Sequence, residues 1–132
     1  MAILHSYTPV RVGDDEFEST VGYYESVFGA PCPLRFRYDA GGLEIATVGT
    51  LVVIGGSQEH LAAAVRQDLV AMVDSIDEWR AALPAAAEVQ QEPADIPTGR
   101  NMYVRNPDGS LFEFVELNPA KVAAVNLAAG HV

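Results

Sequence analysis

The order of predicted elements occurs twice along the chain, and this repeat restricts the possible folds more than any other feature. Each half contains a predicted strand, then a helix, then three short strands of alternating or continuous apolar residues. The halves are offset by about 60 residues, because Gly49 corresponds to Gly109 and Leu51 to Leu111. We therefore predict an α+β fold in which two βαβββ modules form a curved mixed sheet around one cavity.

The first module is expected at about residues 1–57. Its helix is predicted because Phe17 and Val21 begin a stripe of helical spacing, which Gly29 ends. A polar and alanine-rich link, Gln58–Arg66, follows this module. The strands of the module are predicted at Leu4–Val12, Leu34–Asp39, Leu43–Val48 and Thr50–Ile54.

The second module is expected at about residues 66–117, which makes residues 1–117 a single domain. Ser75 and Glu78 are predicted to form a capping box, in which each side chain satisfies the backbone donor of the other residue. The tail, residues 118–132, is predicted either to form a helix or to fray. The strands of the module are predicted at Gln67–Val73, Glu88–Gln91, Arg100–Arg105 and Ser110–Glu116.

The composition limits the partners of the chain. It has 132 residues, 49% of them hydrophobic, which is enough for one core without a disulfide or a structural metal. Cys32 is the single cysteine, so no internal disulfide forms, and we expect a reducing, cytoplasmic location. A net charge of −10 disfavours nucleic acid, and the apolar run Thr50–Gly56 is too short to cross a membrane. We predict a small-molecule partner, with no nucleic acid and no membrane.

Three segments carry a resemblance to a known family. Gly22–Gly29 has an aromatic pair before a Phe-Gly helix end, Met72–Trp79 has a strand-to-helix turn, and Tyr103–Glu113 has a closing hairpin with a glutamate four residues after its glycine. In this order and spacing they resemble the vicinal oxygen chelate superfamily, which includes glyoxalases, bleomycin-resistance proteins, fosfomycin-modifying enzymes and extradiol dioxygenases. The resemblance extends to Leu117, and it implies the paired-module fold and a homodimer.

The resemblance also implies where a metal would be bound. Metal-dependent members take ligands from the first strand of each half and from the last strands, which are the positions of Tyr7, Gln67, Val53 and Glu113 in this chain. Only Glu113 is a good ligand for a divalent transition metal. We therefore predict no metal and no cofactor, with His5, on the strand face of Tyr7, as the alternative ligand. The remaining histidines are predicted to lie on the surface: His60 and His131.

The first functional hypothesis is a bleomycin-resistance-like protein that sequesters or carries an aromatic or polycyclic ligand. The second is a metal-independent isomerase, cyclase or lyase that uses Glu113 or Tyr7 for proton transfer. The third is a metal-dependent enzyme of the glyoxalase or dioxygenase kind. For Glu113 a structural role also stays open, as a carboxylate hydrogen-bonded to Tyr7 or Gln67. The predicted ligand-binding residues are Tyr7, Pro9, Arg11, Phe36, Gln67, Leu69, Tyr103, Leu111 and Glu113.

Overall fold

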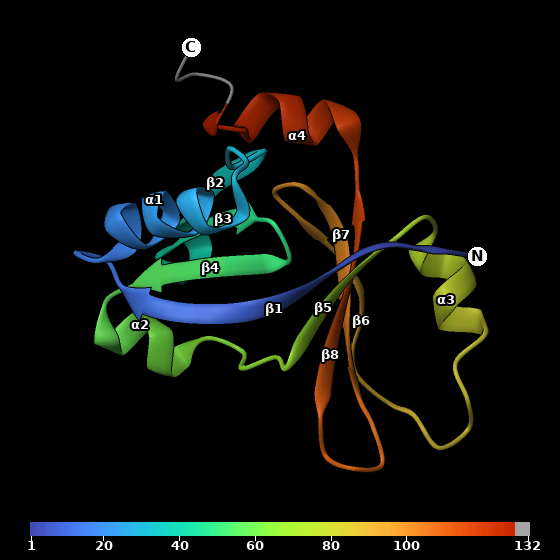
Figure 1. Ribbon diagram of the computed structural model, residues 1–132. Helices are drawn as coiled ribbons and strands as arrows, with labels where there is room; N and C mark the ends of the chain where they lie inside the picture. The colour runs from blue at the N-terminus through green and yellow to red at the C-terminus, as the bar shows by residue number, and fades with distance from the viewer. Residues whose placement is uncertain (129–132) are drawn as a thin grey trace. The chain divides into compact units, whose positions relative to one another are not determined.

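The computed structural model describes residues 1–128, and it confirms the α+β class and the βαβββ order of both halves. His131 lies outside the described residues. The elements, in chain order (Figure 1), are β1 (Ile3–Gly13), α1 (Phe17–Phe28), β2 (Leu34–Tyr38), η1 (Asp39–Gly41), β3 (Leu43–Val48), β4 (Leu51–Gly56), α2 (Gln58–Ala63), β5 (Leu69–Val73), α3 (Ile76–Ala81), β6 (Glu88–Ile96), β7 (Gly99–Arg105), β8 (Leu111–Leu117) and α4 (Pro119–Val125).

The chain forms two compact units that do not follow the order of the sequence. Unit 1 combines Met1–Tyr7 with Arg66–Ala124, and unit 2 combines Thr8–Val65 with the described residues from Val125 onward. Strand β1 contributes to both units, because its first residues pair with β5 and its later residues, from Thr8, pair with β4. The first seven residues therefore belong with the second half of the chain.

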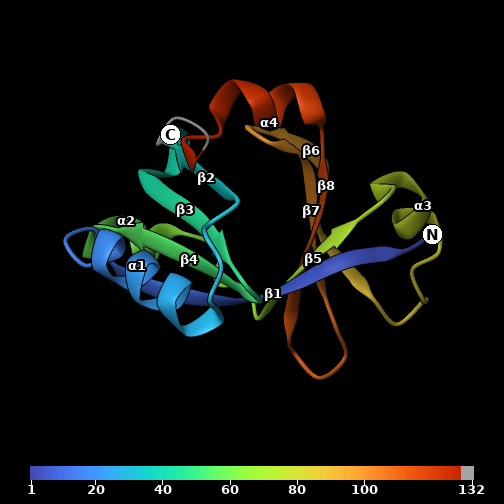
Figure 2. The ribbon, with the colours of Figure 1, turned by 45° about the horizontal axis from the view of Figure 1, so that its top comes forward.

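The sheet of unit 2 has the hydrogen-bonded order β2-β3-β4-β1, in which β1 and β4 are parallel and the other neighbours are antiparallel. Helix α1 covers one face of this sheet (Figure 2). Phe17 and Val21 of the helix pack against Ala46, Val48 and Val53 in a core that is closed to solvent. The predicted stripe of α1 is thus confirmed at Phe17, Val21 and Tyr24, whereas Phe28 at its end is 40% exposed, and the helix ends at Gly29 with φ of 65°.

The sheet of unit 1 has the order β1-β5-β8-β7-β6. Helix α3 covers one face, where Ile76 and Trp79 pack against Met102 and Phe114. The Trp79 and Phe114 rings lie 5.7 Å apart between centroids. Because side chains alternate along a strand, the residues next to Met102 and Phe114 point to the other face of this sheet. That face carries Glu113.

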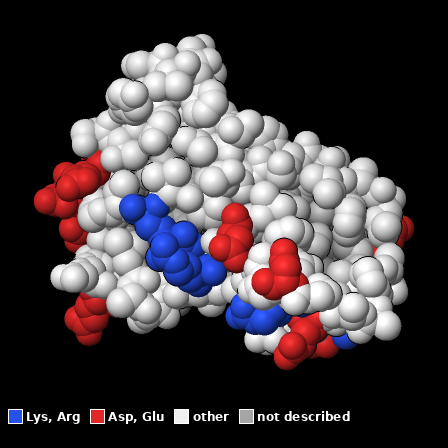
Figure 3. All heavy atoms as spheres, turned by 60° about the horizontal axis from the view of Figure 1, so that its bottom comes forward, with Lys and Arg blue, Asp and Glu red and all other residues white. Residues whose placement is uncertain are grey.

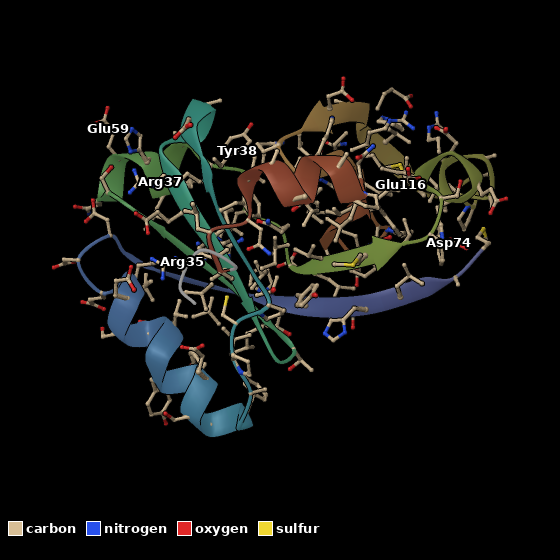
Figure 4. All side chains as sticks on the ribbon, turned by 90° about the horizontal axis from the view of Figure 1, so that it is seen from above. Arg35, Arg37, Tyr38, Glu59, Asp74 and Glu116 are labelled. Atoms are coloured by element: carbon tan, nitrogen blue, oxygen red, sulfur yellow. The ribbon has the colours of Figure 1, made fainter. Side chains whose placement is uncertain are left out.

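The start of α3 differs from the predicted capping box. Ser75 Oγ accepts the Glu78 N–H at 3.3 Å, as expected, but the Ser75 N–H donates to Asp74 Oδ1 at 2.9 Å rather than to Glu78. The Ile76 N–H donates to Glu116 Oε1 at 2.8 Å (Figure 4 labels Asp74 and Glu116). Two carboxylates from outside the helix therefore complete the cap, and the Glu78 carboxylate instead lies 3.5 Å from the Met1 ammonium nitrogen.

The link and the tail both contain helices. Helix α2 occupies most of the segment described from the sequence as a polar and alanine-rich link, and Ser57 caps it by accepting the His60 N–H at 3.1 Å. Helix α4 realises the helical alternative for the tail. After it, Asn126 lies at the free edge of β2, where its Oδ1 accepts the Arg35 N–H at 3.0 Å. The Leu127 N–H donates to the Arg35 carbonyl at 2.6 Å, so this edge residue is paired on both backbone groups.

No helix within residues 1–128 is long and apolar enough to cross a membrane. Acidic and basic side chains lie next to one another in the view of Figure 3, in keeping with the ion pairs of the chain.

Candidate functional site

Four side chains form a row across the face of unit 1 that lies opposite α3. In the strand register, Tyr7 lies beside Val70, Val70 beside Glu113, and Glu113 beside Tyr103. Residues paired in this way point to the same face of a sheet, with strands spaced about 4.8 Å apart. Glu113 therefore lies in a row of tyrosine and valine side chains.

The Glu113 carboxylate accepts a hydrogen bond on each oxygen. Gln67 Nε2 donates to Oε1 at 2.9 Å, and Asn101 Nδ2 donates to Oε2 at 3.0 Å. Both amide residues are buried, with 8% and 6% of their surfaces exposed. The structural interpretation of Glu113 as a partner of Gln67 is therefore confirmed as a contact, and the contact does not remove the binding or catalytic roles.

A second amide fixes the orientation of the first. Gln91 Nε2 donates to Asn101 Oδ1 at 2.9 Å. With its oxygen directed at Gln91, Asn101 presents its N–H₂ group to Glu113. The hydrogen bonds thus run in one direction, from Gln91 of β6 through Asn101 of β7 to Glu113 of β8.

Burial changes the acidity of Glu113. Desolvation of the carboxyl group raises its pKa above the ordinary value of 4.5, and the hydrogen bonds from Asn101 and Gln67 oppose part of this rise because they stabilise the ionised form. A carboxylate that is held by two amides and has a raised pKa can accept a hydrogen bond, and it takes up a proton more readily than an ordinary carboxylate.

Tyr7 is buried, with 9% of its surface exposed, and the His5 ring packs on it with a centroid distance of 4.3 Å. His5 itself is exposed. The predicted sharing of one strand face by these two residues is confirmed by this ring contact. Leu111, two residues before Glu113 on β8, lies on the same face as Glu113.

Leu69 lies on the opposite face from Glu113. It pairs with Phe112, which packs against the core beneath α3. The expected alternation from Gln67 to Leu69 fails because the chain bends at Asp68, whose N–H donates to the Leu111 carbonyl at 2.8 Å before β5 begins.

Three of the predicted residues belong to unit 2 and share one face of its sheet. Arg11 and Phe36 lie in a lateral row with Ile54 and Ile45, on the face opposite α1. Pro9 lies on this face one row away. The same face carries Thr47, which was not predicted as a site residue and whose Oγ1 is buried without a hydrogen-bond partner.

The position assigned to Val53 is wrong. Val53 is fully buried in the core under α1, and the neighbour Val52 occupies the opposite face beside Pro9. Pro9 pairs with Val52 in the first half, and Val70 pairs with Glu113 in the second. Val52, and not Val53, is therefore the counterpart of Glu113. The offset between the halves is thus one residue longer in these strands than between the turn glycines Gly49 and Gly109. A slip of one residue exchanges the two faces of a strand.

The donor set around Glu113 does not fit a divalent metal. A metal ion needs several oxygen, nitrogen or sulfur lone pairs directed at one point. Here Gln67 and Asn101 direct N–H groups at the carboxylate, and the Gln91 bond holds Asn101 in that orientation. Within residues 1–128, no three His, Cys, Asp or Glu side chains are grouped so as to hold a metal. Metal chemistry therefore has no ligand set at this carboxylate.

The two arginines of β2, Arg35 and Arg37, form ion pairs within unit 2 (Figure 4). Arg35 forms an ion pair with Glu18, and its guanidinium lies 5.0 Å from the centroid of the Phe17 ring. This places Arg35 on the face of α1. Arg37 is exposed, with its Nη2 3.7 Å from Glu44 Oε1.

Sequence reasoning missed Asn101 and Gln91. Asn101 has a sequence signal, because it lies two residues before Tyr103 on the same strand and therefore shares its face. Gln91 has none, since its contact depends on irregular pairing of β6.

Comparison with solved structures first shows which proteins share the fold. The chain shares its fold with methylmalonyl-CoA epimerases. The enzyme from Mycobacterium tuberculosis has a TM-score of 0.64 and 16% identity, with 92% of this chain and 93% of that chain covered. A variant of the Streptomyces coelicolor enzyme, in complex with 2-nitronate-propionyl-CoA, has a TM-score of 0.61 and 16% identity, with 88% and 99% covered.

A more similar structure shows the family. An uncharacterized protein from Methanosarcina mazei has 34% identity and a TM-score of 0.80, with 89% of this chain and 95% of that chain covered. The chain belongs to the same family as this protein. No family model matches the chain, and no curated protein matches its sequence.

Proposed function

We propose that the chain is a metal-free small-molecule-binding protein of the glyoxalase/bleomycin-resistance type, within the vicinal oxygen chelate superfamily. The observation that carries this proposal is the Glu113 carboxylate, held between Gln67 and Asn101 in a row that includes Tyr7 and Tyr103. Tyrosine rings supply apolar surface and a hydroxyl group, and the carboxylate orients the ligand. The ligand is an aromatic or polycyclic molecule that is sequestered or carried.

The predicted residues that share a face with Glu113 have expected roles in this proposal, and Leu69, on the other face, has none. Glu113 retains lone pairs beyond the two that its amide partners use, because a carboxylate has about four acceptor positions. Tyr7, Tyr103 and Leu111 provide contact area in unit 1. For Pro9, Arg11 and Phe36, which share one face of the unit 2 sheet, a ligand-binding role stays a prediction.

A ligand screen by thermal shift, with native mass spectrometry of the purified protein, tests the binding function. A ligand that binds the folded state at 100 times its Kd stabilises the protein by about 2.7 kcal/mol. We expect Glu113→Gln to weaken the binding of a hit, and the control Glu88→Gln to leave it unchanged, because Glu88 is an exposed residue of β6. Equal affinities for both variants would remove Glu113 from the site.

A metal-independent isomerase, cyclase or lyase is the second candidate function, and the raised pKa of Glu113 favours it. In such a reaction the carboxylate takes a proton from a carbon next to a carbonyl, the C–H electron pair moves into the carbonyl as an enolate, and the proton is later returned. Tyr7 is the other predicted proton-transfer residue. The epimerases that share the fold suggest an acyl-CoA thioester as the first substrate to test.

Deuterium incorporation from D₂O into methylmalonyl-CoA, followed by mass spectrometry, measures this activity. We expect Glu113→Gln to abolish incorporation while the thioester still binds. Exchange that continues in this variant would assign the base elsewhere. Exchange that requires added Zn²⁺, Co²⁺ or Mn²⁺, with stoichiometric metal in untagged protein, would instead support the metal-dependent hypothesis.

Location and assembly are further proposals. The single cysteine fits a reducing compartment, and we propose the cytoplasm. The homodimer stays a prediction, and light scattering of the purified protein tests it by measuring the molar mass in solution.

A further inference from the structure

We propose that Gln91 is a positioning residue that orients Asn101 and thereby makes the Glu113 site selective for ligands with a cationic N–H donor. The inference rests on the proposed binding function and specifies the ligand class for the same site. It depends on the direction of the hydrogen bonds, on the charge of the groups around Glu113, and on the irregular strand that brings Gln91 to this place.

Strand β6 is irregular on both sides of Gln91. Val89 pairs with Val104 and Gln91 with Tyr103, so two steps along β6 match one step along β7. Ala94 pairs with Asn101, so the three steps from Gln91 to Ala94 along β6 match only two steps from Tyr103 to Asn101 along β7. Such bulges re-aim a side chain and bend the strand locally. Pro93, which has no N–H to donate to a ladder, lies within the second irregularity.

The re-aimed side chain determines which way the Asn101 amide faces. Gln91 Nε2 donates to Asn101 Oδ1 at 2.9 Å, so Nδ2 is the atom left to face Glu113. In the reversed orientation, Asn101 Oδ1 would face a carboxylate oxygen, and two acceptors would meet without a proton between them. The protein therefore presents donors to Glu113 from two sides, and the complementary group on a ligand is another donor.

The charges around Glu113 select among donors. Its hydrogen-bond partners Gln67 and Asn101 are neutral amides, and desolvation is the largest cause of its raised pKa. An ionised Glu113 thus lies in a desolvated place between neutral amides, and a cationic ligand would compensate its charge. The net charge of −10 attracts cations at long range, and Tyr103, whose type of ring attracts cations, lies beside Glu113 in the strand register.

Nuclear magnetic resonance tests the positioning role without any ligand. The variants are Gln91→Met, which keeps the length but cannot hydrogen-bond, and Gln91→Glu, which replaces the donor with acceptors. The control is Gln90→Glu, which makes the same charge change at an exposed neighbour. We expect both Gln91 variants to shift the Asn101 side-chain ¹⁵N resonance and the Glu113 carboxyl ¹³C resonance, and Gln90→Glu to shift neither. Thermal melting confirms that each variant is folded. Unchanged resonances in Gln91→Met would overturn the positioning role.

Three probes of similar shape test the ligand class: benzylamine, benzyltrimethylammonium and benzyl alcohol. Benzylamine has a cationic N–H donor, benzyltrimethylammonium has the charge without a donor, and benzyl alcohol has a donor without the charge. We expect benzylamine to bind most tightly and to shift the Glu113 carboxyl resonance. Gln91→Met should weaken it by about tenfold, as the loss of one well-placed hydrogen bond does.

The outcomes separate this inference from the proposed function. If benzyltrimethylammonium binds as tightly as benzylamine, the N–H donor is unimportant. If benzyl alcohol binds as tightly as benzylamine, the charge is unimportant. Either result overturns the cationic-donor class. If no probe binds while the wider screen yields neutral ligands that need Glu113, the binding function stands and this inference fails. If the screen yields no ligand that needs Glu113, both fail.

Discussion

At the scale of single residues, the structure makes Glu113 depend on the amides that hold it. A hydrogen bond to a carboxylate favours the ionised form, so removing the donor raises the pKa of the group. The effect of an amide is distinct from that of burial, which raises the pKa of Glu113 by disfavouring its charge.

We expect Asn101→Leu to raise the pKa of Glu113 above its already raised value in the wild type. Leucine has a similar volume and no donor, so the carboxyl group stays desolvated and loses one stabilising bond. Titration of the Glu113 ¹³C carboxyl resonance measures the midpoint in both proteins. A midpoint that falls in the variant would mean that water has entered in place of the amide.

Gly99 is a second residue whose role is local. A Cβ atom at this position would lie 1.9 Å from the Glu116 carbonyl oxygen, whereas one at Gly22, in the middle of α1, would meet no atom within 4 Å. We expect Gly99→Ala to destabilise the fold by about 3 kcal/mol or more, because backbone must move. Gly22→Ala should stabilise it by up to about 1 kcal/mol, since alanine favours a helix. Urea unfolding measures both, and equal stabilities would contradict this assignment of Gly99.

At the scale of elements, the free edge of β2 is covered by the residues that follow α4. Asn126 accepts the Arg35 N–H and donates to the Pro33 carbonyl at 3.0 Å, and the Leu127 N–H donates to the Arg35 carbonyl. The Asn126 amide thus takes part of the place of a neighbouring strand. An uncovered strand edge pairs readily with another chain.

We expect Asn126→Ala to cost about 1 kcal/mol and to speed hydrogen exchange at the Arg35 amide, because that donor loses its partner. Leu127→Ala is the matched control, since it keeps the backbone bond to Arg35 and removes only a side chain that is 44% exposed. Exchange mass spectrometry and thermal melting distinguish the two. Equal exchange in both variants would show that Asn126 does not protect this edge.

The elements were predictable where local chemistry is strong. β3 begins and ends at the predicted residues, and α1 has the predicted stripe and the terminal Gly29. α2 was not predicted, because its alanine-rich segment has no apolar stripe and is recognisable only by Ser57 as its cap. The face of Val53 was not predictable from turn glycines, since a difference of one residue between the halves reverses the side of a strand.

The candidate site was likewise predictable only in part from the sequence. Glu113 and Gln67 follow from the pattern of the halves, and they are in contact. Asn101 follows only when the strand face of Tyr103 is extended by two residues. Gln91 depends on two bulges, and bulges have no reliable signature in a single sequence beyond the nearby Pro93.

At the scale of the whole molecule, the excess of acidic residues is the dominant property. The sequence has 18 Asp and Glu residues against 8 Lys and Arg, so many carboxylates repel one another at neutral pH. Ion pairs such as Arg100 with Asp77 offset this repulsion locally. They are exposed pairs, which contribute at most about 1 kcal/mol each.

We therefore expect added salt to stabilise the protein at pH 7. Raising NaCl to about 1 M shortens the screening length to about 3 Å and weakens repulsion between distant carboxylates more than the close pairs. Scanning calorimetry should show a rise in Tm with salt. The rise should shrink near pH 4, where about half of the ordinary carboxyl groups are protonated. A fall in Tm at pH 7 would mean that the ion pairs outweigh the net charge.

The division of β1 between the two units has a consequence for the order of folding. The sheet of unit 2 is made by strands within one continuous stretch, Thr8–Val65, whereas β5 in unit 1 pairs with residues at the far start of the sequence. Contacts between distant residues close large loops, and their entropy cost slows their formation. Assembly of unit 2 also anchors β1, which is continuous with Met1–Tyr7. The early-folding half thereby supplies the late-folding half with a strand already held at one end, and a break in the backbone after Tyr7 would separate the two events.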